Sequence, residues 1–321
     1  MPAVVFLLGT FAIAIVLAAS LLAGASWPRR CPGMAIVLWQ ALGLGWGLAA
    51  VGALVGLGIS GLRVARGPAT GLEVTELAAE RIGRLVVDGS PLGPFGVIAA
   101  LRMISLAAGV ALLGLLVWIL AAAAAAVFRA RHRQRTLLGL LAHDDPKVPG
   151  ALVVDHPAAA AYCVPGLRSA IVISVGALDL LDADELAAVL AHERAHLRAR
   201  HDLVLLPFTA LLRAFRWSAI ARAANADVAL LVEMLADDRA RKRRPARELA
   251  TALLRVGASG GGLAPVGALA VSGNSVDGEL AARVTRLLRP PPSLAFSAKV
   301  GVGILAAVIV LAPATALLLP L

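Results

Sequence analysis

The sequence predicts a mainly α-helical protein that spans a membrane several times and carries a further domain containing a small β-sheet. Hydrophobic residues make up 60% of the 321 residues and charged residues only 16%, a composition far from that of an ordinary soluble domain. Four long apolar segments account for this bias, and the chain between the third and the fourth is more polar. That polar part shows short alternating patterns followed by helical ones, which indicates where the additional domain lies.

Each apolar segment has the length of a membrane-spanning helix. A bilayer core about 30 Å thick requires roughly 20 mostly apolar residues, because backbone polar groups in lipid must be satisfied within the helix. Arg102 lies near the start of the third segment, where its long side chain can reach the interface. The predicted spans cover about residues 3–25, 34–62, 95–128 and 298–321.

The first span has one alternative interpretation, a cleaved signal peptide, because Ala23-Gly24-Ala25 resembles a cleavage site. Its apolar run is too long, however, and no basic residues precede it, which favours an uncleaved span. We therefore predict a three-span membrane anchor over residues 1–128, a separate domain over 129–297, and a fourth span over 298–321.

The basic residues predict the orientation of these spans. Arginines crowd the short first loop and the exit of the third span, and such clusters mark cytoplasmic loops. The longer loop after the second span mixes arginines with acidic residues, and this balance of charges is expected for a loop on the outer side of the membrane. Residues 129–297 are thus expected to be cytoplasmic and both termini outside. The first-loop cluster is Arg29 and Arg30, the exit cluster is Arg129, Arg131, Arg133 and Arg135, and the outer loop carries Arg63, Arg66, Arg81 and Arg84 with Glu73, Glu76, Glu80 and Asp88.

This topology also explains the net charge of +10. No basic strip interleaved with aromatic residues occurs, so direct nucleic-acid binding is not expected. Cys31 and Cys163 both fall on the side expected to be cytoplasmic, which argues against a disulfide. Two isolated cysteines are also not a zinc site.

The domain over residues 129–297 is expected to begin with strands and continue with helices. Apolar patterns separated by prolines and a glycine predict two or three short strands, and after Gly176 the period becomes helical, with an acidic first turn at 182–185. The segment 203–215 is short and very apolar, so it is either a buried helix or one that lies against the bilayer surface. The strands are predicted at 152–154, 161–164 and 170–174, further helices at 228–244 and 278–288, and a loop at 257–262.

The strongest functional signal is the sequence His192-Glu193-Arg194-Ala195-His196 in the body of the helix that follows residue 182. Residues four apart share a helix face, so His192 and His196 can hold one ion, with Glu193 beside it. Zinc at this position would lower the pKa of its water to about 7, and the glutamate could take the proton. The motif is short enough to arise by chance, in which case both histidines would be solvated on an exposed face.

A later helix supplies the remaining candidates. A catalytic zinc needs a third protein ligand and an open position. Glu233 lies within an apolar face formed by leucines, where an unpaired carboxylate would be costly to bury. Asp237, one turn later, can accept a hydrogen bond from the other nitrogen of a ligating histidine and so fix its tautomer. The alternative is an ordinary helix with some acidic residues, since Asp238 and the arginines after it look surface-like.

These motifs together resemble the BlaR/MecR family of bacterial membrane metallopeptidases, relatives of the HtpX and CAAX-prenyl-protease zincins. The resemblance rests on Leu190 to His196, on the ExxAD pattern Glu233-Met234-Leu235-Ala236-Asp237, and on the approach segments Tyr162-Cys163-Val164-Pro165-Gly166 and Ile173-Ser174-Val175-Gly176. It covers about residues 129–297 and implies a zincin-like metallopeptidase domain in a bacterial cell membrane. It also implies one zinc ion held by His192, His196 and Glu233, with Glu193 as the base and Asp237 supporting a ligand.

The resemblance has one departure. The β-lactam sensor-transducers of that family carry an extracellular penicillin-binding domain after the last span, whereas the sequence here stops at Leu321. Their protease is linked to the removal of a small DNA-binding repressor. The expected partners are therefore the lipid bilayer and a cytoplasmic protein substrate, with a comparable repressor as the leading candidate by analogy.

The sequence thus predicts a zinc-dependent endopeptidase that hydrolyses peptide bonds of a protein at the cytoplasmic face of the membrane. One alternative is a non-catalytic signalling or scaffold protein that keeps the zinc fold as a binding module, although the complete set of site residues argues against it. Another is a transporter lined by Arg102, for which a single arginine without a paired acid in another span is weak support.

Several further residues invite a functional interpretation. His201 and Asp202 could support or cap the zinc helix, although solvation is favoured. Tyr162, the only tyrosine, could stabilise an oxyanion, although a half-buried strand residue is favoured. Arg283 and Arg286 could reach a substrate, although basic residues near a membrane are usually topological or solvated. The remaining histidines are expected to be bystanders: His132, His143 and His156.

Overall fold

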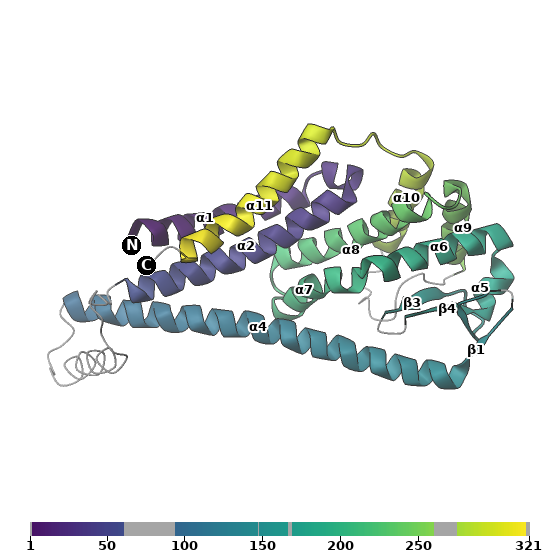
Figure 1. Ribbon diagram of the computed structural model, residues 1–321, viewed down its shortest axis with the longest axis horizontal. Helices are drawn as coiled ribbons and strands as arrows, with labels where there is room; N and C mark the ends of the chain where they lie inside the picture. Colours follow the sequence, from purple (N-terminus) through teal and green to yellow (C-terminus); the bar gives the residue numbers. More distant parts are fainter. Residues whose placement is uncertain (1, 61–93, 147, 166–168, 260–274, 319–321) are drawn as a thin grey trace. The chain divides into compact units, whose positions relative to one another are not determined.

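The computed structural model describes residues 2–60, 94–146, 148–165, 169–259 and 275–318 (Figure 1). Over these residues the protein is mainly α-helical with one small β-sheet, which confirms the predicted fold class. The charged outer loop of the prediction falls in residues 61–93, outside the described residues. In chain order the elements are α1 (Pro2–Ala23), the 3₁₀ helix η1 (Trp27–Arg30), α2 (Pro32–Ile59), α4 (Pro94–Leu141), β1 (Ala142–Asp144), β2 (Leu152–Val154), β3 (Ala161–Val164), β4 (Ala170–Ser174), α5 (Val175–Leu180), α6 (Ala183–Ala199), α7 (His201–Ala214), α8 (Ala219–Ala240), α9 (Ala246–Ala258), α10 (Ser275–Leu288) and α11 (Phe296–Leu318).

Four helices are long and apolar enough to cross a membrane, as the sequence predicts for a multi-span membrane protein. They are Ala3–Ala23 in α1, Pro32–Ile59 in α2, Val97–Leu141 in α4 and Phe296–Leu317 in α11. The third helix does not end near residue 128 but continues through the arginine cluster to Leu141. No proline interrupts it there, so the charges end the apolar run without ending the helix. Its 48 residues extend about 70 Å, more than twice the thickness of a bilayer core.

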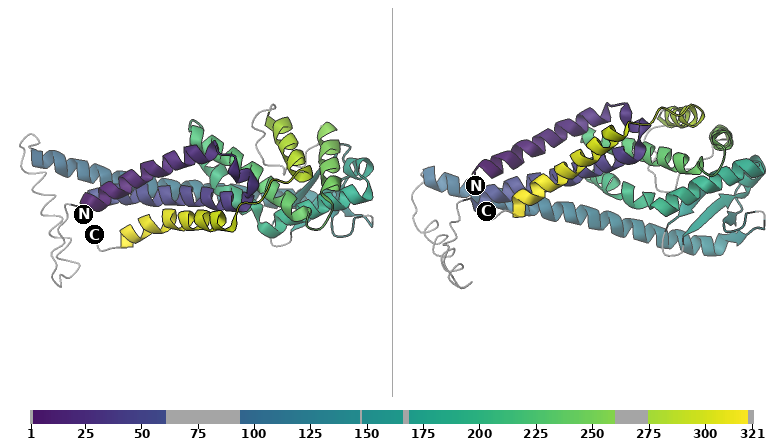
Figure 2. Two further views of the ribbon diagram at one scale, coloured as in Figure 1. Left: turned by 90° about the horizontal axis from the view of Figure 1, so that it is seen from above. Right: turned by 45° about the horizontal axis from the view of Figure 1, so that its top comes forward.

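Two compact units divide the chain. Unit 1 comprises Met1–Ala19, Gln40–Trp118 and Ile304–Leu321, and unit 2 comprises Ser20–Trp39 and Ile119–Gly303. In unit 1 the segments of α1, α2 and α11 run alongside one another (Figure 2). The sheet, α5 to α10, η1 and the later part of α4 belong to unit 2.

Small residues allow the helices of unit 1 to pack closely. A Cβ atom on Gly45 would lie 2.5 Å from the carbonyl oxygen of Ile309, and one on Gly58 would lie 2.5 Å from Cβ of Leu106. The Ser105 hydroxyl donates a hydrogen bond of 2.8 Å to the carbonyl oxygen of Leu54. Glycine contacts and hydroxyl bonds of this kind hold membrane helices together, because lipid offers no hydrophobic driving force between them.

The sheet of unit 2 has four strands in the order β1-β2-β4-β3. β2 and β4 are parallel, while β1 and β3 pair antiparallel with β2 and β4 respectively. All three predicted strands are present. β1 is additional, since its residues Ala-His-Asp carry no apolar pattern. α6 packs against β3 and β4 on one side and against α8 on another, and Figure 1 shows it running between the sheet and α8.

Two side-chain caps fix the path from the sheet into α6. Ser174, the last residue of β4, accepts a hydrogen bond from the N–H of Ala177 and so begins α5. Asp182 begins α6, because its carboxylate accepts hydrogen bonds from the N–H groups of Asp184 and Glu185. The Glu185 carboxylate accepts one in return from the N–H of Asp182, which completes a capping box. The predicted helix with an acidic first turn is therefore confirmed.

Replacing Asp182 by alanine is expected to lower the free energy of unfolding by about 1 kcal/mol, because two N–H groups at the start of α6 lose their acceptor. Chemical unfolding of the purified full chain in detergent, followed by circular dichroism, measures this loss. Asp184→Ala serves as the control, since its side chain is 74% exposed and caps nothing. An equal loss in both variants would contradict the capping role.

The helices after α6 differ from the prediction mainly in where they begin. α8 begins at Ala219 rather than near residue 228, because Ser218 caps it and its alanine-rich first turns favour a helix without an apolar stripe. α9 is an additional helix that starts directly after Pro245. It extends over Gly257 and Ala258, and residues 260–262 of the predicted loop lie outside the described residues.

α7 lies close to its predicted range and packs inside unit 2. It contacts α6 and α8, and its buried Ala210 packs with Ile119 and Ala123 of α4. Phe208 of α7 is buried as well. α7 thus has a buried face, which agrees with the first of its two predicted alternatives, a buried helix.

Candidate metal centre

α6 carries the histidine motif inside the protein. The His192 side chain is fully buried, Glu193 is 3% exposed, and the His196 side chain is 12% exposed. The helix is enclosed because the sheet, α8 and α9 all pack against it. The alternative of two solvated histidines on an exposed face is therefore wrong.

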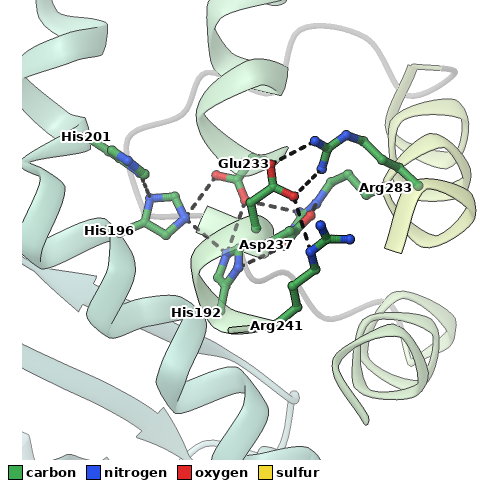
Figure 3. A network of polar contacts seen from close by, with 9 residues as sticks. His192, His196, His201, Glu233, Asp237, Arg241 and Arg283 are labelled. Carbon is green, nitrogen blue, oxygen red and sulfur yellow. Dashed lines mark hydrogen bonds and ion pairs between the residues drawn. The ribbon is translucent and has the colours of Figure 1, made fainter. Parts of the chain in front are cut away.

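Glu233 of α8 faces both histidines (Figure 3). The Nε2 atoms of His192 and His196 lie 3.0 Å apart. Oε2 of Glu233 lies 3.4 Å from Nε2 of His192, and Oε1 lies 3.6 Å from Nε2 of His196. One ligand atom of each residue thus lies within 4.8 Å of the other two, so the three side chains could hold a metal ion.

These separations fit the geometry of zinc. Two ligand atoms bound to zinc at 2.0–2.1 Å and at the tetrahedral angle lie about 3.3 Å apart. The three observed separations, 3.0, 3.4 and 3.6 Å, lie around this value. Two imidazoles and one carboxylate are also a ligand set of hydrolytic zinc sites, which leave a fourth position for water.

Each histidine has a partner at its Nδ1 atom. Nδ1 of His192 lies 3.0 Å from Oδ1 of Asp237, as the sequence pattern predicts for Asp237. Nδ1 of His196 lies 3.0 Å from Nδ1 of His201, whose Nε2 is in turn 3.1 Å from the Arg239 guanidinium. The carboxylate of Asp237 can accept the Nδ1 proton of His192, which fixes the orientation of this ring and leaves its Nε2 atom free to face the ion.

The burial of His201 differs from the sequence expectation. Solvation was favoured, but the residue is only 3% exposed. The cause is Arg200, which ends α6 in a left-handed conformation with φ 50° and ψ 45° and leads directly into α7. This sharp turn folds His201 back against His196, and no periodic sequence pattern reveals it. Asp202 is paired as well, because it accepts a hydrogen bond from Arg131 of α4.

Arg283 of α10 reaches the same cluster, which corrects a second expectation. Its Nε and Nη2 atoms donate hydrogen bonds of 2.9 and 2.8 Å to the carboxylate of Asp237. Its Nη1 lies 3.1 Å from Oε2 of Glu233, and its side chain is 11% exposed. The favoured interpretation of Arg283 as a topological or solvated residue is therefore wrong.

Arg286 repeats this arrangement one turn later. It donates hydrogen bonds of 2.7 and 2.8 Å to the two carboxylate oxygens of Asp238, so neither residue is simply solvated. Its Nε also donates to the carbonyl oxygen of Arg29 in η1. The sequence carries no signal for these pairs, because 46 residues separate Asp237 from Arg283 and 48 separate Asp238 from Arg286.

The electrostatics of the cluster favour a cation. Burial alone would raise the pKa of Glu233, but Arg283 and His196 hold it well below its ordinary value, so this carboxylate stays ionised. Burial alone would lower the pKa of His192, but Asp237 and Glu233 raise it to about 10. The space between the imidazoles and Glu233 therefore attracts positive charge, as a site for a divalent ion must.

Glu193 has a different environment from the other two carboxylates. Burial raises its pKa, and its side chain is hydrogen-bonded to the Cys163 thiol of β3. Burial, followed by the charge of Glu193, raises the pKa of Cys163 above its ordinary value, so the thiol stays protonated and donates to the carboxylate. A buried carboxyl group with a raised pKa is suited to accept and release a proton.

Other residues that the sequence singled out are Tyr162, the two cysteines and three histidines. Tyr162 is half-buried in β3, as favoured from the sequence. Cys31 and Cys163 are both free thiols. The three bystander histidines are exposed: His132, His143 and His156.

The comparison with known families agrees with this site. Residues 127–237 match the family model described as Peptidase family M48, whose members are metal-dependent. The matched segment is about a third of the chain and contains every candidate from His192 to Asp237. It supports a metallopeptidase, while the closer resemblance to the BlaR/MecR family stays a prediction. No curated protein and no solved structure matches the chain.

Proposed function

We propose that the chain is a membrane-embedded zinc endopeptidase that hydrolyses peptide bonds of a protein substrate at the cytoplasmic face of the membrane. The observation that carries the proposal is the convergence of His192, His196 and Glu233 from two helices, with Glu193 buried beside them. The family match over the same residues supports it. Zinc is the proposed ion because the ligand types and their separations fit its tetrahedral geometry.

The side chains divide the chemistry between them. When bound, zinc would lower the pKa of a water molecule to about 7 and polarise the scissile carbonyl group. Glu193 takes a proton from the water as its oxygen forms a bond to the carbonyl carbon. Glu193 then gives the proton to the nitrogen as the carbon–nitrogen bond breaks. Asp237 keeps the proton of His192 on Nδ1 and so leaves Nε2 available as a ligand.

The arginines support the proposed cytoplasmic location. Arg29 and Arg30 in η1 and the arginines at the polar end of α4 belong to unit 2, the same unit as the metal centre. Clusters of arginine next to spans are retained on the cytoplasmic side. Because all of these residues share one compact unit, the site is proposed to lie on that side as well.

The proposed substrate is a cytoplasmic protein, with a small DNA-binding repressor as the first candidate. This choice rests only on analogy with the BlaR/MecR family, because resemblance in fold or motif does not determine a substrate. The analogy implies a role in signal transduction across the membrane.

Chelation tests both the activity and its side of the membrane. The full chain is produced in bacterial cells, and inverted vesicles, which expose the cytoplasmic face, are compared with right-side-out vesicles. Protein fragments that depend on the chain are identified by mass spectrometry. A membrane-impermeant chelator is expected to stop their formation in inverted vesicles only, and added Zn²⁺ is expected to restore it.

The outcomes separate the alternatives. Fragments that persist in chelated inverted vesicles would show that the chain is not a metal-dependent peptidase. Inhibition in right-side-out vesicles alone would place the site on the outer side. If the purified chain binds zinc but neither type of vesicle yields fragments, the non-catalytic scaffold would be favoured.

A further inference from the structure

We infer that Arg283 of α10 is a positioning residue of the metal centre, which orients Glu233 as a ligand and Asp237 as the partner of His192. Through these two carboxylates it sets the affinity of the site for its ion. The inference rests on the proposed metal centre and extends it to a helix beyond the matched residues 127–237.

Arg283 contacts two carboxylates of the site, that of Asp237 and that of Glu233. Its Nε and Nη2 atoms form a two-point contact with Asp237, whose Oδ1 also faces Nδ1 of His192. Its Nη1 contacts Oε2 of Glu233 and leaves Oε1, which faces His196, for the ion. A planar guanidinium with five donors can serve both carboxylates at once in fixed directions. Figure 3 shows Arg283 reaching these carboxylates from the side opposite His201.

The formal charges of the site support this role. Glu193 and Asp237 are 3% and 1% exposed, and the Glu233 side chain is 25% exposed. With all three carboxylates ionised, Arg283 reduces the charge of the cluster from −3 to −2, which a divalent ion neutralises. Buried charges that are not balanced in this way are costly.

Loss of Arg283 has two opposing consequences, and their balance can be measured. Removing a cation strengthens the attraction of the remaining carboxylates for a metal ion. The same substitution, however, removes the donors that hold Glu233 and Asp237 in position. A pure charge effect therefore predicts tighter metal binding, and positioning predicts weaker binding.

Arg286 provides a matched control within the same pair of helices. It also makes a two-point contact with an aspartate of α8, through Nη1 and Nη2 to Asp238, where Arg283 uses Nε and Nη2 to contact Asp237. Both arginine side chains are 11% exposed. Arg286 differs in having no contact with a candidate ligand. If Arg283 only joined α10 to α8, its loss and that of Arg286 would have the same effect.

The test measures metal binding by the full chain in detergent. The Zn²⁺ dissociation constant is obtained by competition with a chromophoric chelator, and the visible absorption of bound Co²⁺ reports the ligand geometry. Arg283→Met is expected to weaken Zn²⁺ binding by about 10- to 100-fold, the usual effect of losing a partner that orients a ligand. Arg286→Met is expected to bind Zn²⁺ like the wild-type chain. Arg283→Lys, which keeps the charge but not the fork of donors, is expected to lie between them.

Each result bears on the inference. Zn²⁺ binding by Arg283→Met that is as tight as in the wild type, or tighter, would overturn it, and so would an equal loss in Arg286→Met. Folding of Arg283→Met is checked by the unfolding transition of the metal-free chain. If this variant does not fold, Zn²⁺ binding by Arg283→Lys tests the inference instead. Wild-type affinity and a wild-type Co²⁺ spectrum in that variant would mean that charge alone suffices. A wild-type chain that binds no zinc would instead overturn the proposed function, and this inference with it.

Discussion

Replacing Glu193 by glutamine is expected to lower the rate of peptide-bond cleavage by about 10²- to 10⁴-fold while the metal stays bound. The amide keeps the size of the side chain and can still accept a hydrogen bond from Cys163, but it cannot take a proton from water. Burial raises the pKa of Glu193, which means that the ionised carboxylate is unfavourable at this position. The substitution replaces that carboxylate by a neutral amide. The midpoint of unfolding is therefore not expected to fall. Fragment formation, bound zinc and unfolding are measured on the same purified chain.

Glu185→Gln is the control for this substitution. Glu185 is another buried glutamate of α6, two turns before Glu193, and it pairs with Arg255 and the N–H of Asp182. Its replacement is expected to affect stability and to leave both bound zinc and cleavage unchanged. Cleavage by Glu193→Gln at the wild-type rate would rule out Glu193 as the base. Loss of zinc from that variant would instead indicate a ligand role that its position beside the ligands does not predict.

The parts of the fold with a clear apolar or helical pattern could be predicted, and those without such a pattern could not. The spans and α6 follow from apolar length, helical period and an acidic first turn, all of which are local features. The length of α4 beyond residue 128 was missed because charges end an apolar run without breaking a helix. β1 was missed because its residues have no apolar pattern and pair only through their backbone with β2.

In the candidate site, too, local patterns could be predicted and tertiary contacts could not. His192, Glu193 and His196 are set by helix periodicity, and Glu233 and Asp237 share a second helix, so each group is visible in the sequence. The packing of α6 on α8 brings the two groups together, and one ligand atom each of His192, His196 and Glu233 lies within 4.8 Å of the other two. His201 was assigned to solvent because its burial depends on the single left-handed residue Arg200. Arg283 was interpreted as topological or solvated because only tertiary structure joins α10 to α8.

Glu233→Gln is expected to remove the metal, in contrast to Glu193→Gln. The substitution takes away the one anionic ligand of the proposed set and leaves two neutral imidazoles. The Zn²⁺ dissociation constant is expected to rise by more than about 100-fold, since losing a ligand costs more than losing a partner that orients one. Cleavage should be lost with the metal and should recover in part at high Zn²⁺ concentration, which distinguishes a ligand from a base. Competition with a chromophoric chelator and fragment formation at increasing Zn²⁺ measure both effects.

Asp238→Asn tests whether any acidic residue at this end of α8 has the same effect. Asp238 is paired with Arg286 in the way that Asp237 is paired with Arg283, but it contacts no candidate ligand. Its substitution is expected to leave the zinc content and the cleavage rate unchanged. Wild-type zinc content in Glu233→Gln would mean that the third ligand is another residue, and the site proposed from α6 and α8 would be wrong. The expected result is that zinc is lost in Glu233→Gln and retained in Asp238→Asn and Glu193→Gln. It would assign Glu233 as the ligand, Asp238 as the partner of Arg286 and Glu193 as the base.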